Sequence, residues 1–196
     1  MQEFIKYYIQ SSIQTKQELL SDAKLLKTIE AAAKALVQAY RQCKKVLLAG
    51  NGGSAADAQH IAGELVSRFY FERPGLSAVA LTTDTSILTA IGNDYGYEKL
   101  FARQVQANGL AGDVFIGIST SGNSPNIIAA LQEAKRRKLR TIGLTGAADC
   151  QMNRDKLCDF LIKVPALETP KIQESHIMLG HILCALVEKT LFKAKK

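Results

Sequence analysis

Apolar residues recur at helical spacing over the first 43 residues of the chain. Isoleucine returns at every fourth position from Ile5 to Ile13, and leucines and alanines continue the pattern to residue 37. Ser21 and Asp22 interrupt it, and both residue types favour a helix N-cap. We therefore predict two helices within residues 1–43, separated at this pair. We expect this helical lead-in to pack across a partner subunit.

From residue 44 onward, short apolar runs alternate with helical segments. The expected strands are apolar on both faces and cover residues 46–49, 78–81, 114–118, 141–144 and 160–164. The expected helices cover residues 54–69, 97–107, 125–138 and 170–191. Doubly apolar strands separated by helices are typical of a parallel sheet that is covered on both sides. No linker or repeat divides the chain, so we expect one α/β domain over residues 1–196, with a helical lead-in (1–43) and an α/β core (44–196).

The composition is that of a protein with a substantial core. Hydrophobic residues make up 47% of the chain and charged residues 22%, which argues against disorder. The apolar runs are of strand length, far below the roughly 18 residues of a membrane span, and the N-terminus lacks the apolar segment of a signal peptide. The four cysteines are scattered without a C-x-x-C pair. We expect a cytoplasmic protein with reduced thiols and no membrane partner.

The net charge of +7 raises the question of a nucleic-acid partner. The densest basic cluster, residues 135–138 with Arg140, falls at the end of an expected helix, where cations complement the helix dipole. No aromatic residues are interleaved with it, and no recognition helix is evident. A basic protein also suits acidic, phosphorylated substrates. We therefore expect no nucleic-acid partner.

The first of two strand-to-helix turns suited to an anion is Gly50-Asn51-Gly52-Gly53-Ser54. Its glycines allow backbone N–H groups to approach a ligand closely, and the following helix presents its positive end. The segment formally fits a dinucleotide fingerprint, but the acid after the second strand, Asp84, lies well beyond the expected spacing of about 20 residues. No lysine follows as in a nucleotide-binding P-loop.

The second turn carries four hydroxyl groups within six residues, on Ser119, Thr120, Ser121 and Ser124. It lies between a buried strand and a helix N-terminus, where hydroxyl and backbone N–H groups suit a phosphate monoester. The alternative is a capping loop, because serine and threonine are preferred N-caps. One serine is explained by capping, whereas four hydroxyls around a glycine favour phosphate.

Two further pairs of polar residues lie on expected helices. His60 and Glu64 are separated by four residues and share a helix face, a spacing that can bind a metal but more often reflects a surface hydrogen bond. Gln173 and His181 lie eight residues apart on one broad face of the last helix. Taken alone, His181 among apolar neighbours is more typical of a buried core histidine.

Together these segments resemble the phosphoheptose isomerases, a family of the sugar-isomerase, or SIS-domain, superfamily. The matching segments are residues 50–54, 57–65, 91–94, 117–124, 172–176 and 180–183. The resemblance implies a flavodoxin-like parallel sheet and a homotetramer with active sites at subunit boundaries. It also implies conversion of sedoheptulose 7-phosphate to D-glycero-D-manno-heptose 7-phosphate, the first step toward the activated heptose of bacterial surface polysaccharides such as lipopolysaccharide.

The resemblance also assigns roles to individual residues. A zinc ion would be held by His60, Glu64, Gln173 and His181. The sugar would contact Asn51, Gly52, Gly53, Ser54, Asn93 and Asp94, together with Glu64 and Gln173, and the phosphate would contact Ser119, Thr120, Ser121 and Ser124. Glu64 and His181 would exchange protons, which agrees with the need of an aldose–ketose isomerisation for a base and an acid.

Some members of the family carry an acid where this chain has Pro170, and the nearby Glu168 receives no role. A non-catalytic SIS protein that binds the replication initiator is an alternative, although we expect such proteins to lack the histidine found here at position 181. An isomerase or sensor for another sugar phosphate is a second alternative. His, Glu and Gln ligands suit several divalent ions, so the metal is open as well.

Overall fold

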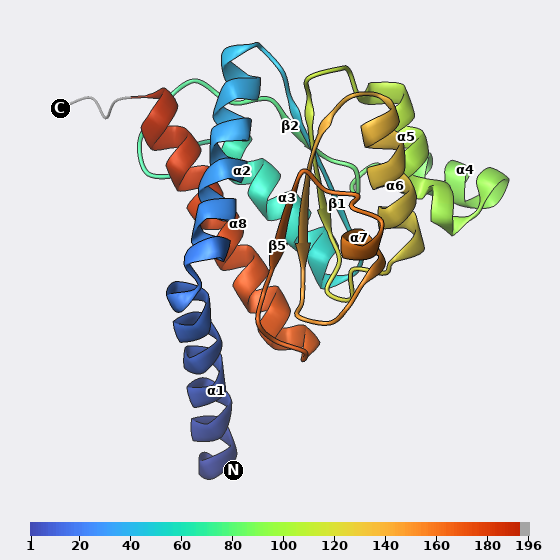
Figure 1. Ribbon diagram of the computed structural model, residues 1–196. Helices are drawn as coiled ribbons and strands as arrows, with labels where there is room; N and C mark the ends of the chain where they lie inside the picture. The colour runs from blue at the N-terminus through green and yellow to red at the C-terminus, as the bar shows by residue number, and fades with distance from the viewer. Residues whose placement is uncertain (193–196) are drawn as a thin grey trace.

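Five parallel strands lie at the centre of the fold (Figure 1). The computed structural model describes residues 1–192, so residues 193–196 of the expected domain lie outside the described residues. The strands are β1 (Val46–Gly50), β2 (Ala78–Ala80), β3 (Val114–Ile118), β4 (Arg140–Thr145) and β5 (Phe160–Lys163). Their order across the sheet is β2-β1-β3-β4-β5, which is the flavodoxin-like order. The predicted α/β fold with a parallel sheet is therefore confirmed.

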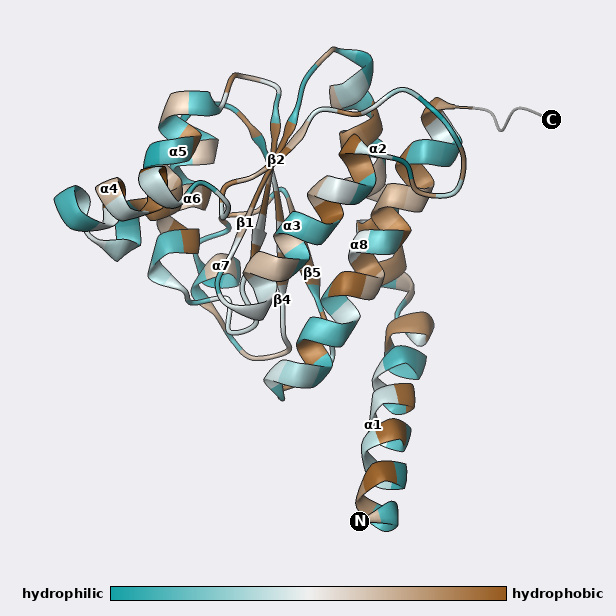
Figure 2. Ribbon diagram, turned by 180° about the vertical axis from the view of Figure 1, so that it is seen from behind, coloured by the Kyte–Doolittle hydropathy of each residue, from teal (hydrophilic) through white to brown (hydrophobic). Residues whose placement is uncertain are grey.

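Helices cover both faces of this sheet, as Figures 1 and 2 show. They are α1 (Gln2–Ser21), α2 (Ala23–Arg41), α3 (Gly53–Val66), α4 (Thr85–Tyr95), the short 3₁₀ helix η1 (Tyr97–Lys99), α5 (Leu100–Asn108), α6 (Pro125–Arg136), α7 (Gln151–Arg154) and α8 (Thr169–Leu191). Val46 and Leu48 of β1 join a core shared with α2, α3 and α8, whereas Leu47 and Ala49 join a second core shared with α5 and α6. This burial on both sides explains the continuous apolar sequence of the central strands.

The predicted elements agree with the structure, except for two helices that the sequence did not indicate. The break between the first two helices is confirmed at Asp22, whose Oδ1 accepts hydrogen bonds from the backbone N–H groups of Lys24 and Leu25, both at 2.9 Å. The expected strands and long helices are present with small shifts at their ends. The unpredicted helices are α4 and α7. In the described structure α4 has no fully buried residue, and its apolar pattern is short, with Leu88 and Ile91 partly buried against the core shared with α5 and α6.

Helix α1 extends away from the rest of the domain (Figure 1). Its buried residues are Thr15 and Leu19, near its C-terminal end, where Ser12 and Lys16 also contact Glu174 of α8. Its N-terminal part exposes large apolar side chains, namely Phe4, Ile5, Tyr7, Ile9 and Ile13. Across residues 1–192, we find no helix whose length and apolar character would let it span a membrane.

His176, which ends the matching segment 172–176 of the last helix, is entirely buried in α8. Neither ring nitrogen has a hydrogen-bond partner among the described residues. Burial lowers the pKa of His176 to about 4, although the nearby backbone of Thr145 acts in the opposite direction. The imidazole is therefore neutral in the folded protein at neutral pH.

We expect acid to destabilise the protein through His176. As the pH falls from 6.5 toward about 4, the unfolded chain binds a proton that the buried imidazole does not, so the free energy of unfolding decreases. Each unit of pKa corresponds to about 1.4 kcal/mol, so the loss reaches about 3 kcal/mol at the lower limit. Urea unfolding across this pH range should show a shallower pH dependence for His176→Phe than for the wild-type protein. Parallel pH profiles for the two proteins would contradict this assignment.

Candidate functional site

The two turns singled out in the sequence lie side by side in the structure. Strands β1 and β3 are neighbours, and Gly50 at the end of β1 is in register with Ile118 at the end of β3. Both turns therefore emerge at the same edge of the sheet, next to the N-termini of α3 and α6. Among the described residues, no side chain forms an N-cap hydrogen bond at Gly52 of α3 or at Ser124 of α6. Several N–H groups of the two first turns bond to nearby carbonyls, such as Ala55 and Ala56 to Gly52 and Ile127 to Ser124, so both helix ends offer an anion mainly the positive end of the helix dipole.

Hydroxyl groups organise the turn between β3 and α6. The buried Ser119 Oγ lies 2.8 Å from Ser124 Oγ and accepts a hydrogen bond from the backbone N–H of Gly122 at 3.1 Å. Ser121 is exposed, and Thr120 and Ser124 are partly exposed. Because the Ser124 hydroxyl contacts Ser119 and does not cap α6, capping alone does not account for the serines of this turn. The arrangement supports the phosphate interpretation of the sequence.

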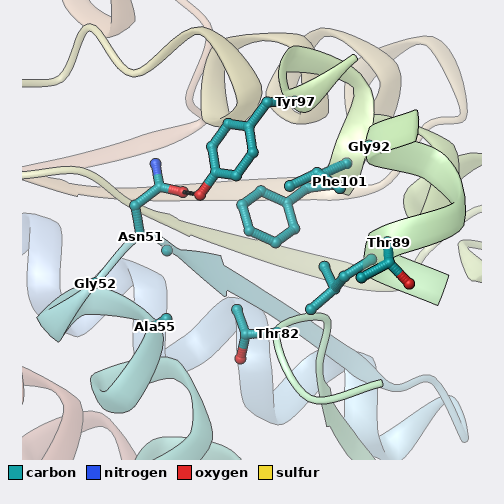
Figure 3. Close-up of a pocket in the computed structure, with 11 residues that line it drawn as sticks. Asn51, Gly52, Ala55, Thr82, Thr89, Gly92, Tyr97 and Phe101 are labelled. Atoms are coloured by element: carbon teal, nitrogen blue, oxygen red, sulfur yellow. Dashed lines mark hydrogen bonds between the residues drawn. The ribbon is translucent and has the colours of Figure 1, made fainter. Parts of the chain in front are cut away.

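Asn51, in the other turn, is held by a pair of amide contacts. Its Nδ2 donates to Asn126 Oδ1 at 2.9 Å, and Asn126 Nδ2 donates back to Asn51 Oδ1 at 2.8 Å. The Tyr97 hydroxyl also donates to Asn51 Oδ1 at 3.1 Å (Figure 3). These contacts connect the first turn to α6 and to η1. Neither Asn126 nor Tyr97 was predicted from the sequence, although a polar residue directly after Pro125 in the first turn of α6 was a usable signal.

A pocket of about 540 Å³ lies above this turn (Figure 3). Its lining combines the predicted residues Asn51 and Gly52 with residues of β1, α3, the β2–α4 connection, α4, η1 and α5. These are Gly50, Ala55, Thr82, Leu88, Thr89, Gly92, Tyr97, Leu100 and Phe101. The other predicted sugar contacts lie outside the lining. Asn93 and Asp94 are exposed on α4 and hydrogen-bond to each other, and Ser54 is buried within the first turn of α3.

A cluster of three potential metal ligands forms where α3 packs against α8. One ligand atom each from His60, Glu64 and His181 lies within 4.8 Å of the others. The two histidine Nε2 atoms are 2.8 Å apart, and His60 Nε2 is 3.3 Å from Glu64 Oε1. His181 is partly exposed, so it is not the buried core histidine that its neighbours in sequence suggested. Two imidazoles and a carboxylate that converge in this way fit a divalent cation and leave coordination positions for a substrate.

Gln173, the fourth predicted ligand, is placed differently. Its amide lies against Gly53, where an added β-carbon would be 2.7 Å from Gln173 Nε2. Gly53 and His60 are two turns apart on α3, so the amide lies next to the glycine turn, about 10 Å along the helix from the backbone of His60. A ligand role for Gln173 therefore stays a prediction. Glu168, which received no role, forms an ion pair with Lys171 at 2.8 Å.

Asp57 adds a carboxyl group near the cluster. It lies one turn before His60 on α3, and one of its oxygens is buried without a hydrogen-bond partner among the described residues. Burial raises the pKa of Asp57, and the charge of His60 counteracts this increase. The sequence analysis placed Asp57 in a matching segment without giving it a role.

Comparisons with known proteins identify the relatives of this chain. The family model described as SIS domain matches residues 7–146. The chain is 64% identical to a phosphoheptose isomerase of Aneurinibacillus thermoaerophilus over 195 residues, which cover 100% of this chain and 98% of that protein. It is 60% identical to phosphoheptose isomerase 2 of Campylobacter jejuni, with 98% of this chain and 94% of that protein covered.

Solved structures give the same result. The structure of a phosphoheptose isomerase from Neisseria gonorrhoeae matches with a TM-score of 0.88 and 45% identity, over 96% of this chain and 98% of that chain. The structure of a phosphoheptose isomerase from Francisella tularensis matches with a TM-score of 0.90 and 38% identity, over 95% and 97% of the two chains. Sequence and fold therefore agree over nearly the whole length of the chain.

Proposed function

Because the chain belongs to the phosphoheptose isomerase family of SIS-domain proteins, we propose that it interconverts sedoheptulose 7-phosphate and D-glycero-D-manno-heptose 7-phosphate. The single observation that best supports this reaction is the convergence of His60, Glu64 and His181. The reaction would take place in the cytoplasm and supply heptose for bacterial surface polysaccharides, including lipopolysaccharide. No observation favours the alternative of a protein that binds the replication initiator, for which we expected no histidine at position 181.

The acid–base chemistry belongs to Glu64 and His181. Isomerisation moves a proton between C1 and C2 of the sugar through an enediol, while protons also move on the two oxygens. The Glu64 carboxylate is the base for the carbon-bound proton, and the His181 imidazole transfers protons at the oxygens. His60 and Glu64 on α3 and His181 on α8 would hold a zinc ion, with Gln173 as the fourth ligand. When bound there, the ion would supply Lewis-acid polarisation of the substrate oxygens.

The two turns position the substrate at its two ends. The phosphate would bind the hydroxyls of Ser119, Thr120, Ser121 and Ser124 at the positive end of the α6 dipole. The sugar would contact Asn51, Gly52, Gly53 and Ser54 in the first turn, with Asn93, Asp94, Glu64 and Gln173. The amide pair of Asn51 and Asn126 fixes the first turn relative to α6, so the two ends of the substrate would be bound in a defined geometry.

We further propose that the functional form is a homotetramer. The N-terminal part of α1 leaves apolar side chains in solvent, including Phe4 at 67% and Ile9 at 55% exposure, because α1 extends beyond the domain. A surface of this kind is stabilised when a second copy covers it. The tetramer would bring neighbouring subunits to the active sites, in keeping with the family resemblance.

The first prediction of this proposal concerns Glu64 and His181. Replacing Glu64 by Gln, or His181 by Gln, should lower kcat for sedoheptulose 7-phosphate by about 10²-fold or more, which is the usual contribution of general acid–base catalysis. The circular dichroism spectrum should be unchanged, because both side chains are partly exposed. A variant with near-normal turnover would remove that residue from the mechanism.

The second prediction concerns the phosphate. Ser121→Ala and Ser124→Ala should each raise KM for the phosphorylated sugar by about tenfold or more, because a hydrogen bond to a charged group contributes about 1.5–3 kcal/mol. Thr28→Ala is a matched control, since Thr28 is a hydroxyl residue on α2 that bonds only to a carbonyl of its own helix. Unchanged KM values in both serine variants would place the phosphate elsewhere.

The third prediction concerns assembly. A variant with both Ile9→Lys and Ile13→Lys should sediment as a smaller species than the wild-type protein, because the charges oppose burial of the apolar face of α1. Gln14→Lys places a similar charge about 100° around α1 from Ile13 and about 140° from Ile9, and it should leave the assembly intact. Identical sedimentation of all three proteins, or a monomeric wild-type protein with full activity, would contradict the tetramer.

A further inference from the structure

A buried ion pair lies between the C-terminal end of α3 and α8, the two helices that carry the metal-ligand cluster. The side chains of Arg73 and Glu188 are 2% and 0% exposed, and Arg73 Nε donates to Glu188 Oε1 at 3.1 Å. Arg73 belongs to the irregular segment that connects α3 to β2, whereas Glu188 lies near the end of α8. The cost of burying two charges at this depth requires further hydrogen bonds to both groups.

The Arg73 guanidinium supplies those bonds to the C-terminal end of α3. Its Nη2 donates to the carbonyl of Glu64 at 2.8 Å, and its Nη1 donates to the carbonyl of Leu65 at 2.7 Å and to that of Ser67 at 3.1 Å. These carbonyls belong to the last turn of the helix, where no intrahelical donor remains and where a cation is favourable. Arg73 therefore holds the turn that carries the Glu64 side chain.

Glu188 holds the segment that follows α3. Its Oε1 accepts from the backbone N–H of Phe69 at 2.8 Å, and its Oε2 accepts from that of Tyr70 at 2.7 Å. Burial acts to raise the pKa of Glu188, but these two amides and Arg73 together hold the pKa below its usual value. The carboxylate is therefore charged at neutral pH, as the pair with Arg73 requires.

The same contacts reach Glu64 and the surroundings of His181. Glu64 is bonded through its backbone to Arg73, and Glu188 lies seven residues, or about two turns, after His181 on α8. The centre of the Phe69 ring is 5.6 Å from that of His181. One ion pair thus connects the backbone of Glu64, the segment that packs on His181, and the helix that carries His181.

We propose that Arg73 and Glu188 are positioning residues that fix the Glu64 carboxylate relative to His181. They touch neither metal nor substrate, and they set the affinity of the cluster for its metal ion and the efficiency of proton transfer. Supporting groups around metal ligands contribute about 10- to 100-fold to metal affinity or activity. This inference rests on the proposed function, because it concerns the same cluster.

A purely structural ion pair would have different consequences, and the chain provides a control for it. Lys45 Nζ and Asp113 Oδ2 form a second ion pair at 2.6 Å, and the Asp113 side chain is 2% exposed. Asp113 also accepts from the backbone N–H groups of Lys45 and Leu110. This pair lies where β1 and β3 begin, at the edge of the sheet opposite to the two anion turns. Asp113→Asn therefore removes a buried carboxylate of similar bonding far from the cluster.

The test compares Arg73→Lys, Glu188→Gln and Asp113→Asn with the wild-type protein. For each protein, the dissociation constant for zinc is measured on the metal-free form by competition with a chromogenic chelator. The melting temperature of the metal-free form, and kcat and KM for sedoheptulose 7-phosphate, are measured alongside. Arg73→Lys keeps the charge but loses the planar guanidinium group, whose several N–H donors bond to more than one carbonyl at once. Should it fail to fold, Glu188→Asp, which keeps the charge and shortens the side chain, replaces it.

We expect Arg73→Lys and Glu188→Gln to weaken zinc binding by about 10- to 100-fold and to lower kcat, with little change in KM. Asp113→Asn should lower the melting temperature while zinc affinity and kcat stay at wild-type values. If the Arg73 and Glu188 variants also keep wild-type zinc affinity and kcat, the positioning role is wrong and the pair is structural. If the wild-type protein itself neither binds zinc nor turns over the sugar, the proposed function fails, and this inference fails with it.

Discussion

Close packing of α3 against α8 is the constraint on which the candidate site depends. A β-carbon at Gly180 would lie 2.5 Å from Ile61 Cδ1, and one at Gly53 would meet the amide of Gln173, so both glycines allow the two helices to approach closely. At this separation the side chains of one helix reach those of the other. His60 and Glu64 therefore meet His181, although more than one hundred residues separate them in the chain.

The sheet supplies the second half of the site. The chain runs from β1 to β2 on one side of the sheet and then to β3 on the other side of β1, so the ends of β1 and β3 lie side by side. Open α/β sheets bind ligands at such a switch point. Two helix N-termini without side-chain caps meet there, one after a glycine turn and one after a turn of hydroxyl residues. A phosphorylated sugar offers an anion for the second turn and hydroxyl groups for the first. The architecture thus matches the two kinds of group in the substrate that we propose.

Much of this arrangement was predictable from the sequence, because it depends on local patterns. The alternation of apolar strands with helices gave the parallel sheet, Asp22 marked the break between α1 and α2, and the glycine and serine turns stood out by composition. The family resemblance connected His60, Glu64 and His181, whereas spacing alone gave only a weak metal pair and an apparent core histidine. The packing of α3 on α8 is a tertiary contact, which no single helix encodes.

Other residues of the site are not indicated by any local sequence pattern. Helix α4 has no fully buried residue in the described structure, and of its residues in the pocket lining only Gly92 lies in a segment that matches the family, so Thr89 was not foreseen. The amide pair of Asn51 and Asn126 requires the register of β1 and β3, which becomes known only with the sheet. Arg73 and Glu188 appear in the sequence as ordinary charged residues, and only their complete burial identifies them.

Incorporation of deuterium from solvent during isomerisation through an enediol tests the central claim directly. The zinc-loaded protein is incubated with sedoheptulose 7-phosphate in D₂O, with and without a chelator, and the sugars are followed by NMR. The account predicts that D-glycero-D-manno-heptose 7-phosphate forms with deuterium at C2, because the base exchanges its proton with solvent, and that the chelator suppresses both conversion and exchange. Absence of the aldoheptose phosphate, or conversion that the chelator leaves unchanged, would contradict the account of a metal-dependent isomerase.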